Sequence, residues 1–431
     1  MRPNTNMKSD GPKGSGDSVR HSASTRMPGE ADEAMRHTLA AGVAGRKPFD
    51  RGDALRRGAR VGYIGPMHAR VNRWWVGCAV TLGVAACPLP SPALAAARTL
   101  ERFESQLDRI RVKLAIPGMS AIVMQRQTVV WEGALGLADI PSRRPVTPAT
   151  KFHLASLTKT FASTIVLQLV EEGRVRLDDP IGEYGIRVPG PGVIRVRHLL
   201  SHTSEGVPGE QFRYNGDRFA LLDHVIRRTT REPFATRVME RIVRPLALDD
   251  TAPNPLDAAA FAASGRDSAA YVADMASGYG VDKRNRPVPV AYPASFSSAA
   301  GLVSTARDVA RYSAALDSGQ FLSAATRALA YTPARGAGDR VLPYGLGWFV
   351  SNVRGHTLVW HYGYWTGNSS LIIKEPDRGL TFVVLANSDQ LSARFKLGTG
   401  DLMSSTVARA FVDAFVTGSL GPRHLSTHEG P

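Results

Sequence analysis

The sequence predicts an α/β (α+β) fold, with a mixed, mainly antiparallel sheet made from both ends of one domain and flanked by helices. β-prone runs occur early and return late in the chain, at 120–124, 128–132, 356–360, 369–374 and 380–385. The residues between these two groups, about 161–290, follow helical periodicity and are interrupted by Pro- and Gly-rich loops. Strands at both ends with helices between them therefore predict one sheet with an inserted all-helical subdomain.

The composition is that of a globular protein, since 43% of the 431 residues are hydrophobic and 21% are charged. This length suits one large domain, which we place at 98–418, followed by a polar tail at 419–431. The formal net charge is +15, and residues 98–431 contain no basic run. We expect a basic surface that favours peripheral association with a membrane or cell-wall polymer, and no nucleic-acid partner. The sequence does not indicate an oligomeric state.

The first 97 residues do not resemble part of this domain. Residues 1–66 lack hydrophobic periodicity, which indicates a disordered or non-native extension. From Met67, a charged segment, an apolar run and the small-x-small sequence Ala93-Leu94-Ala95 have the layout of a signal peptide at 67–97. We therefore expect an exported protein, periplasmic or extracellular. One alternative is a lipoprotein anchored through Cys87, and another is an uncleaved anchor, although the apolar run is shorter than the roughly 20 residues of a membrane span.

Within the domain, the expected elements follow from local patterns. Apolar residues at helical spacing predict a first helix at 98–114. The next two β-prone runs form a hairpin, and Gly133 and Gly136 indicate a turn after it. After the late strands, a final helix is expected at 401–416.

A candidate catalytic pair lies at Ser156 and Lys159, where an amphipathic helix is expected at 160–172. Residues three apart share a helix face, so the hydroxyl and the amine can come within hydrogen-bond distance. The unpaired N–H groups at this helix terminus favour developing negative charge. Serine becomes a nucleophile when a base takes its proton, so Lys159 would have to be kept neutral by burial or by nearby cations. The alternative is an N-cap serine followed by a solvated lysine, which the motif alone does not exclude.

Other types of site have weaker support. The domain has no cysteine, because Cys78 and Cys87 both precede it, so disulfides, cysteine nucleophiles and cysteine-based zinc sites are excluded there. His198 and His202 are four apart and could share a helix face, but no third zinc ligand accompanies them. The segment 202–206 is one residue short of a nucleophile elbow and lacks the strand that should lead into it, so we interpret it as a structural turn. We expect neither a metal nor an organic cofactor.

Several further motifs extend the pattern around Ser156. They are, in order, Ile116-Pro117-Gly118-Met119, Gly136-Leu137-Ala138-Asp139, Leu177-Asp178-Asp179-Pro180, Leu199-Leu200-Ser201-His202-Thr203-Ser204, Ala300-Gly301-Leu302-Val303-Ser304-Thr305 with Arg307-Asp308, and Tyr344-Gly345-Leu346-Gly347-Trp348. In order and spacing, the chain resembles the serine β-lactamase and penicillin-binding-protein superfamily, specifically its class C branch. That branch also contains D-Ala-D-Ala carboxypeptidases, D-aminopeptidases and esterases. The resemblance implies a β-lactamase/transpeptidase-like fold and acyl-enzyme chemistry without a cofactor.

The same resemblance assigns a tyrosine to work with Lys159. The family's second motif is usually Tyr-x-Asn, and here Tyr214-Asn215-Gly216 stands at its offset. The resemblance thus implies a general acid/base role for Tyr214. The family asparagine hydrogen-bonds the lysine and the substrate amide, so Gly216 in its place argues against β-lactam-type recognition. Asn215 is a candidate to take over part of that role.

The family's third motif, Lys-Thr-Gly or His-x-Gly, corresponds to His361-Tyr362-Gly363, which we expect where a strand ends, on an edge strand beside the nucleophile. The resemblance implies that His361 positions or polarises the substrate and that Gly363 lets it approach the backbone. The Tyr364 N–H would join the Ser156 N–H as the oxyanion hole. Such a hole contributes about 3–4 kcal/mol per donor in the transition state.

We therefore expect an exported serine hydrolase that cleaves an ester or amide bond through a Ser156 acyl-enzyme. The altered second motif and the histidine in the third favour an esterase or a D-amino-acid peptidase over a β-lactamase. The expected partner is thus a small-molecule ester, β-lactam or D-amino-acid peptide. A non-hydrolytic protein of the same fold, either a penicillin-binding sensor or a scaffold, is the alternative from another functional class.

Overall fold

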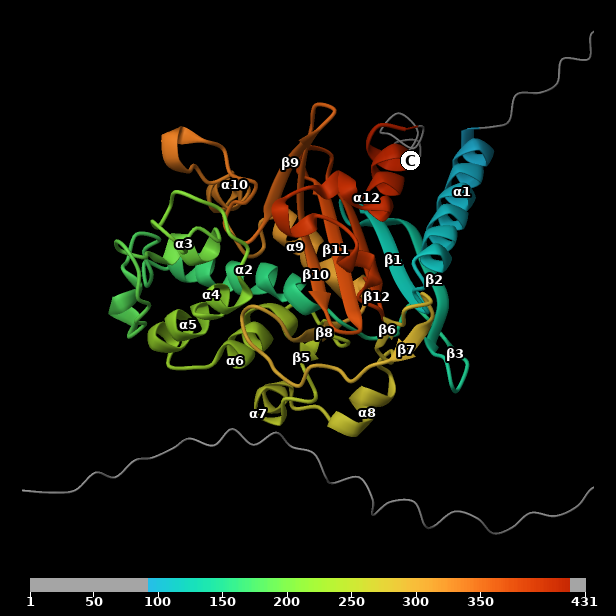
Figure 1. Ribbon diagram of the computed structural model, residues 1–431, viewed down its shortest axis with the longest axis horizontal. Helices are drawn as coiled ribbons and strands as arrows, with labels where there is room; N and C mark the ends of the chain where they lie inside the picture. Colours follow the sequence, from blue (N-terminus) through green and yellow to red (C-terminus); the bar gives the residue numbers. More distant parts are fainter. Residues whose placement is uncertain (1–91, 419–431) are drawn as a thin grey trace, which may run out of the picture. The chain divides into compact units, whose positions relative to one another are not determined.

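The computed structural model describes residues 92–418, whose centre is a seven-stranded sheet (Figure 1). The strand order is β3-β2-β1-β12-β11-β10-β9, and every neighbouring pair is antiparallel. Its strands are β1 (Gly118–Gln125), β2 (Thr128–Asp139), β3 (Arg144–Pro145), β9 (Phe349–Val353), β10 (His356–Trp365), β11 (Asn368–Glu375) and β12 (Leu380–Ala386). The predicted fold class is confirmed, because strands from both ends of the domain meet where β1 pairs with β12.

Helices and two small sheets complete the domain. The helices are α1 (Pro92–Lys113), α2 (Thr158–Glu171), α3 (Val196–Leu200), α4 (Gly216–Ala220), α5 (Leu222–Thr230), α6 (Phe234–Val238), α7 (Ala258–Phe261), α8 (Ser268–Ala273), α9 (Ala306–Asp317), α10 (Ala324–Ala330), α11 (Gln390–Ala393) and α12 (Thr406–Phe411). The small sheets are β4 (Phe152–His153), β8 (Leu302–Ser304) and β5 (Ala252–Pro253), and β6 (Tyr279–Val281) with β7 (Pro287–Pro289). The segment expected to be all helical is therefore mostly helical but also contains β5, β6 and β7.

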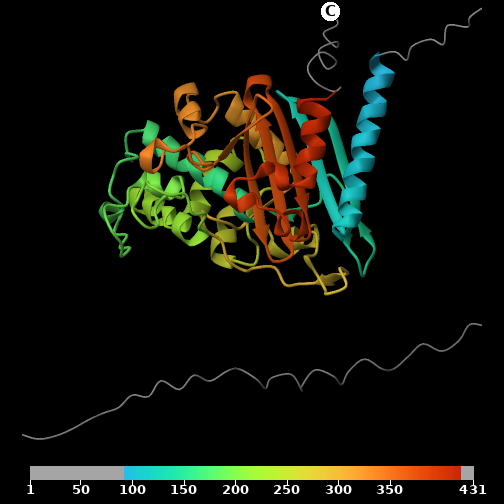
Figure 2. The ribbon, with the colours of Figure 1, turned by 45° about the horizontal axis from the view of Figure 1, so that its top comes forward.

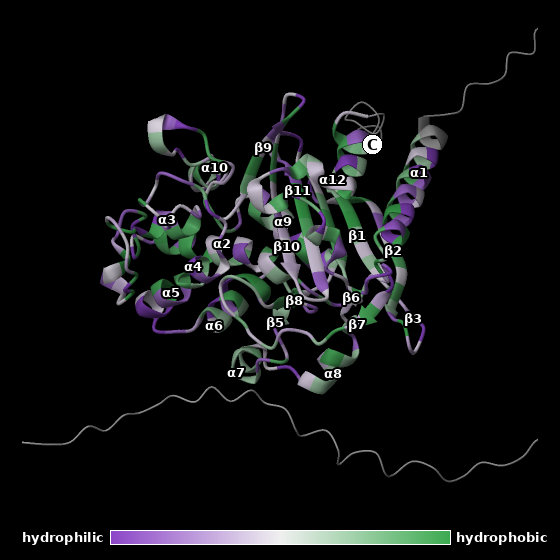
Figure 3. Ribbon diagram, viewed as in Figure 1, coloured by the Kyte–Doolittle hydropathy of each residue, from purple (hydrophilic) through white to green (hydrophobic). Residues whose placement is uncertain are grey.

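The sheet separates two layers of helices, because successive residues of a strand point to opposite faces. On one face, α1 and α12 pack against Phe382 and Val384, and on the other α2 and α9 pack against Val383 and Ile372 (Figure 2). The inner strands β1 and β12 are mainly hydrophobic, as Figure 3 shows. Both faces of the sheet are thus buried, and the catalytic candidates lie at its β10 side.

Helix α2 is the central helix of the inner layer. It begins at Thr158, two residues before the expected start, and follows a 3₁₀ turn at Ala155–Leu157 that contains Ser156. Eleven of its fourteen residues are buried, including the polar Lys159. A helix buried nearly all round lies inside the protein, so its first turn is fixed by packing on several sides.

Two expected boundaries are wrong. Gly133 and Gly136 lie inside β2, because a glycine at 136 lets the strand pass close to the Pro117 carbonyl, where a Cβ would come within 2.1 Å of the oxygen. The expected helix 401–416 is divided into a 3₁₀ turn at Leu402–Ser404, α12 and a π-helical turn at Val412–Val416.

The predictions about the two chain ends remain predictions. The extension at 1–66, the signal-peptide run through residue 91, Cys87 and the tail at 419–431 lie outside the described residues. Helix α1 begins at Pro92, upstream of the expected start at residue 98. Among residues 92–418, no helix combines the length and apolar character that a membrane crossing needs.

Candidate active site

The turn that carries Ser156 is held from both sides. Ala155 before it has a φ of +49°, and its N–H donates to His153 Nδ1 at 3.0 Å. Its carbonyl accepts from the Thr158 hydroxyl at 2.8 Å. Ser156 is partly exposed, whereas Ala155 and Leu157 are buried. The serine hydroxyl therefore reaches solvent at the start of α2, where backbone N–H groups lack helical acceptors.

Lys159 is brought to the serine by the expected spacing. Its Nζ lies 2.9 Å from Ser156 Oγ and 2.9 Å from the carbonyl oxygen of Ala299. The side chain is almost completely buried, and this desolvation lowers the pKa of Lys159 to about 7, although Asp217 acts to raise it. A substantial fraction of the amine is therefore neutral near pH 7, which is the state a general base requires.

Tyr214 lies over the same amine. Lys159 Nζ is 5.1 Å from the centre of the Tyr214 ring. Burial raises the pKa of Tyr214 well above its usual value. The Tyr214 hydroxyl is buried and has no hydrogen-bond partner among the described residues. The phenol is therefore adjacent to the Ser156–Lys159 pair but not aligned with either group.

The rest of the Tyr-Asn-Gly motif is arranged differently from the family pattern. A Cβ at Gly216 would lie 4.0 Å from Lys159 Nζ and would touch nothing closer, so the missing side chain leaves open space beside the amine. The Asn215 side chain is already engaged, because its Oδ1 caps α4 by accepting from Arg218 N–H and its Nδ2 donates to Glu205. These two bonds fix the orientation of the Asn215 amide within the protein.

His361 is close to the site but turned into the protein. It is fully buried, its Nδ1 donates to the Tyr362 carbonyl at 2.7 Å, and its Nε2 accepts from the Tyr344 hydroxyl at 2.9 Å. Burial is the main cause that lowers the pKa of His361 to about 3, so the ring is neutral. Both ring nitrogens are occupied, and the imidazole offers no group to a substrate in this structure.

The expected position of this motif at a strand end needs correction. Strand β10 continues through Gly363 to Trp365 because Gly363 fits tightly where a side chain could not. A Cβ there would lie 2.2 Å from the Leu154 carbonyl oxygen and 3.1 Å from Ala155 Cβ. The strand therefore lies directly against the turn that carries Ser156.

β10 is an edge strand over only half its length. β9 pairs with it at 356–360, and no strand among residues 92–418 pairs with its second half on that side. A two-residue turn joins the paired residues Trp365 and Asn368, so the N–H groups of alternate residues point away from β11. The Tyr364 N–H thus points to the free edge beside the serine turn, where an oxyanion hole would need it. The Tyr364 residue is 52% exposed.

Three contributors were not identified from the sequence. The Ala299 carbonyl accepts from Lys159, but a backbone acceptor has no sequence signature. His153 holds the serine turn, although its position near Ser156 gave no signal of its own. His202 belongs to a quoted motif and was interpreted as part of a turn; its ring lies 4.4 Å from that of Tyr214.

The suggestion that His198 and His202 share a helix face is wrong. Helix α3 ends at Leu200, so the two residues do not share a helix face. His198 Nδ1 accepts from Arg195 N–H, and His202 Nδ1 accepts from Asn215 N–H. Within the part of the chain that the structure describes, no three metal-ligating side chains are grouped.

Comparison with known proteins gives the family. Residues 100–401 match the Beta-lactamase family. The chain is 25% identical over 308 residues to penicillin-binding protein 4* of Bacillus subtilis (strain 168), covering 61% of this chain and 66%, just under two thirds, of that protein. The fold is similar to D-amino acid amidase from Ochrobactrum anthropi SV3 (TM-score 0.59, 21% identity, 74% and 99% of the two chains). It is also similar to EstCE1, a hydrolase with promiscuous acyltransferase activity (TM-score 0.58, 20% identity, 73% of this chain and 99% of that chain). The chain therefore belongs to the beta-lactamase family, within the β-lactamase and penicillin-binding-protein superfamily.

Proposed function

We propose that the protein is a serine hydrolase that cleaves an ester or an amide of a D-amino acid through an acyl-enzyme on Ser156. The observation that carries this proposal is the 2.9 Å contact of Ser156 Oγ with Lys159, whose burial lowers its pKa to about 7. A solvated lysine at a helix start would have neither feature. The N-cap interpretation is also disfavoured, because no side-chain cap bond is made at the start of this helix.

The proposed reaction has two halves. Neutral Lys159 takes the hydroxyl proton of Ser156 while Oγ bonds to the carbonyl carbon, and the N–H groups of Ser156 and Tyr364 stabilise the oxyanion. The proton passes through Tyr214 to the leaving alcohol or amine as the bond between the leaving group and the carbonyl carbon breaks. A water molecule then attacks the acyl carbon while Lys159 accepts a proton from it, the bond from that carbon to Ser156 Oγ breaks, and Lys159 returns the proton to Oγ as the carboxylic acid leaves.

The substrate class follows from the space beside Lys159. Without a side chain at Gly216, the site lacks the amide that the family uses to orient a β-lactam. Both ring nitrogens of His361 are engaged inside the protein and the Asn215 amide is bound to Glu205 and Arg218, so we assign the carbonyl contact to the backbone edge at Tyr364. Backbone groups can hold a simple ester or amide carbonyl. The similarity in fold to a D-amino acid amidase and to EstCE1 supports the same choice.

A substrate panel tests this function on the full chain. Short-chain p-nitrophenyl esters, D-amino-acid amides, D-Ala-D-Ala peptides and nitrocefin are compared by steady-state kinetics. We expect turnover of esters or D-amides with a kcat/KM at least about 10-fold above that for nitrocefin, a difference that one missing hydrogen bond accounts for. Stoichiometric labelling by penicillin without turnover would identify a sensor instead. The absence of both labelling and turnover would identify a scaffold.

Replacing Gly216 with asparagine should shift the substrate preference from esters and D-amides toward β-lactams. The Cβ of the new side chain would lie 4.0 Å from Lys159 Nζ, so its amide could reach the lysine and a bound amide. We expect the ratio of nitrocefin to ester kcat/KM to rise by about 10-fold. Gly216→Ala is the matched control, since it fills the same space without an amide and should leave the ratio unchanged. An equal ratio in the asparagine and alanine variants contradicts this account of the motif.

The pH dependence of the reaction should report Lys159. The neutral amine is the active form, and burial lowers its pKa to about 7, so kcat/KM should rise with pH and level off above about pH 8. The rising part of the kcat/KM profile, measured with an ester at constant ionic strength, should fit one apparent pKa near 7. A profile that is flat from pH 5.5 to 9 would exclude a lysine base with this pKa.

A further inference from the structure

His202 contacts the chain on both sides of Tyr214. It follows α3 with a φ of +54°, a conformation in which histidine is among the more tolerated side chains. Its carbonyl accepts from the Arg213 N–H at 2.8 Å, and its ring Nδ1 accepts from the Asn215 N–H at 3.2 Å. One residue therefore binds the backbone groups immediately before and immediately after the tyrosine.

The same ring also supports the phenol itself. The ring centres of His202 and Tyr214 are 4.4 Å apart with a tilt of 37°. On its other sides His202 contacts the rings of Phe219 at 5.3 Å and Tyr344 at 4.9 Å. The histidine ring is 1% exposed, so it cannot swing away without opening this cluster. The ring contacts pack around the phenol, and the two backbone hydrogen bonds of His202 hold the segment that carries the phenol beside Lys159.

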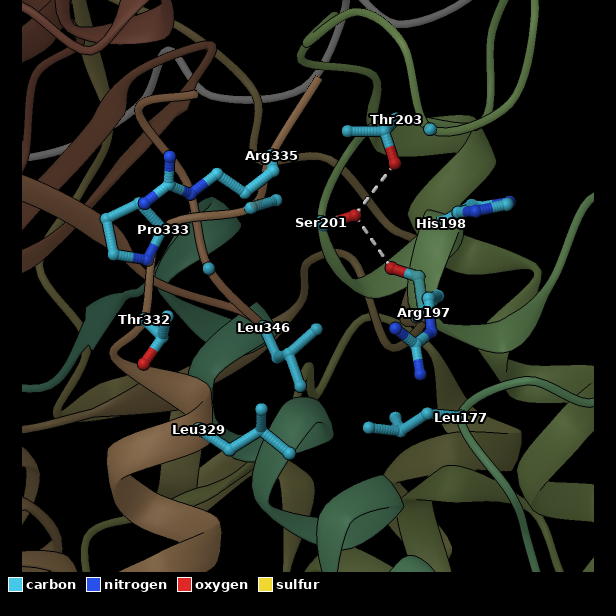
Figure 4. A pocket seen from close by; sticks show the side chains of 13 residues that line it. Leu177, Arg197, His198, Ser201, Thr203, Leu329, Thr332, Pro333, Arg335 and Leu346 are labelled. Carbon is cyan, nitrogen blue, oxygen red and sulfur yellow. Dashed lines mark hydrogen bonds between the residues drawn. The ribbon is translucent and has the colours of Figure 1, made fainter. Parts of the chain in front are cut away.

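The neighbours of His202 do not share this task. Ser201 and Thr203 hydrogen-bond each other at 2.8 Å and line a cavity of about 420 Å³ together with Leu177 and Leu329 (Figure 4). Their side chains thus face a space rather than Tyr214. In this loop the link to the tyrosine segment is made by His202.

The protonation state of His202 suits this link. Because Nδ1 accepts a hydrogen bond, the neutral ring carries its proton on Nε2, which is buried without a partner among the described residues. Burial is the main cause that lowers the pKa of His202 well below its usual value, and Lys159 acts in the same direction. The ring therefore remains an acceptor for Asn215 across the working pH range.

We propose that His202 is a positioning residue for Tyr214, which it holds beside Ser156 and Lys159 through the Asn215 N–H. The proposal rests on the proposed function for its kinetic consequence, but its structural part does not depend on hydrolysis. It assigns a task to a histidine that the sequence analysis placed in a structural turn.

Two substitutions separate the parts of this role. His202→Phe keeps a ring in the aromatic cluster but removes the acceptor for the Asn215 N–H. His202→Asn keeps an acceptor at the position of Nδ1 and tolerates the positive φ, but it removes the ring. Thr203→Val is the matched control, because it removes only the hydroxyl that faces Ser201 and the cavity.

Kinetics and amide exchange are measured on all three full-length variants. In His202→Phe we expect kcat to fall by about 10- to 100-fold with KM changed by less than about threefold, since a misplaced general acid/base affects the chemical step. Hydrogen exchange of the peptide spanning 212–216 should accelerate. His202→Asn should keep the slow exchange and most of the kcat, and Thr203→Val should match the wild type.

A second measurement separates positioning from general stability. If His202 acts through Tyr214, His202→Phe should add no further loss of kcat in a Tyr214→Phe background. Equal losses in both backgrounds, or unchanged exchange at 212–216, overturn the proposal. If the wild type hydrolyses nothing while exchange responds to His202→Phe but not to His202→Asn, the proposed function fails and the positioning role stands.

Discussion

Replacing Ser156 with alanine should abolish hydrolysis, lowering kcat by about 10⁴-fold or more, the size of effect seen when a nucleophile is removed. The substitution removes the atom that forms the acyl-enzyme and leaves the serine turn intact, since that turn is held by His153 Nδ1 and the Thr158 hydroxyl. The variant should also lose all covalent labelling by a fluorophosphonate, measured as the mass shift of the intact protein. Its melting temperature should stay close to that of the wild type.

A second serine on the same helix provides the control. Ser163 in α2 is buried and donates to the Leu346 carbonyl at 2.7 Å. Ser163→Ala should lose roughly 1 kcal/mol of stability through that hydrogen bond but keep labelling and turnover. Labelling or turnover that survives in Ser156→Ala would remove the nucleophile assignment and, with it, the proposed mechanism.

Replacing Lys159 with methionine should nearly abolish turnover and at the same time stabilise the fold. The loss of the base should cost about 10³- to 10⁴-fold in kcat. Burial lowers the pKa of Lys159 from 10.5 to about 7, so the folded state binds fewer protons than the unfolded state between these values. The lysine therefore destabilises the fold most below pH 7, and this penalty fades as pH rises toward 10.5. We expect methionine to gain on the order of 2 kcal/mol at pH 7 and progressively less at higher pH.

Lys374 in β11 is the contrasting buried lysine. It is also fully buried, but its Nζ forms an ion pair with Asp317 at 2.7 Å. Lys374→Met leaves the partly exposed Asp317 carboxylate without its partner, so it should lower stability and leave the Ser156 site intact. Denaturant unfolding at several pH values measures both variants. A Lys159→Met protein that is less stable than wild type at pH 7 would contradict the inference that the buried amine of Lys159 destabilises the fold.

The parts of the site that were predictable are those set by local geometry. Ser156 and Lys159 share a helix face at a fixed spacing, so their 2.9 Å contact follows from local sequence. The orientation of His361 was not predictable, because it depends on Tyr344, 17 residues earlier and outside β10, whose hydroxyl donates to its Nε2. The Ala299 carbonyl was missed for the same reason, since only the folded chain brings a backbone acceptor to Lys159.

The fold shows the same division. The early and late strands were recognisable from their β-branched and aromatic residues, which predict pairing but not its exact extent. β2 was cut short at Gly133 because glycine usually marks a turn, whereas here the close approach of Pro117 requires glycine at Gly136 inside the strand. Such tight contacts between distant backbones decide where a strand can continue, and no local pattern encodes them.

The pairing of β1 with β12 constrains how the chain reaches this fold. Met119 lies opposite Ala386, so the middle of the sheet joins the first strand of the domain to its last. Chain entropy makes contacts so distant in sequence slow to form. During synthesis, the β1–β2 hairpin therefore remains unpaired on the β12 side of β1 until the ribosome has synthesised the final strand.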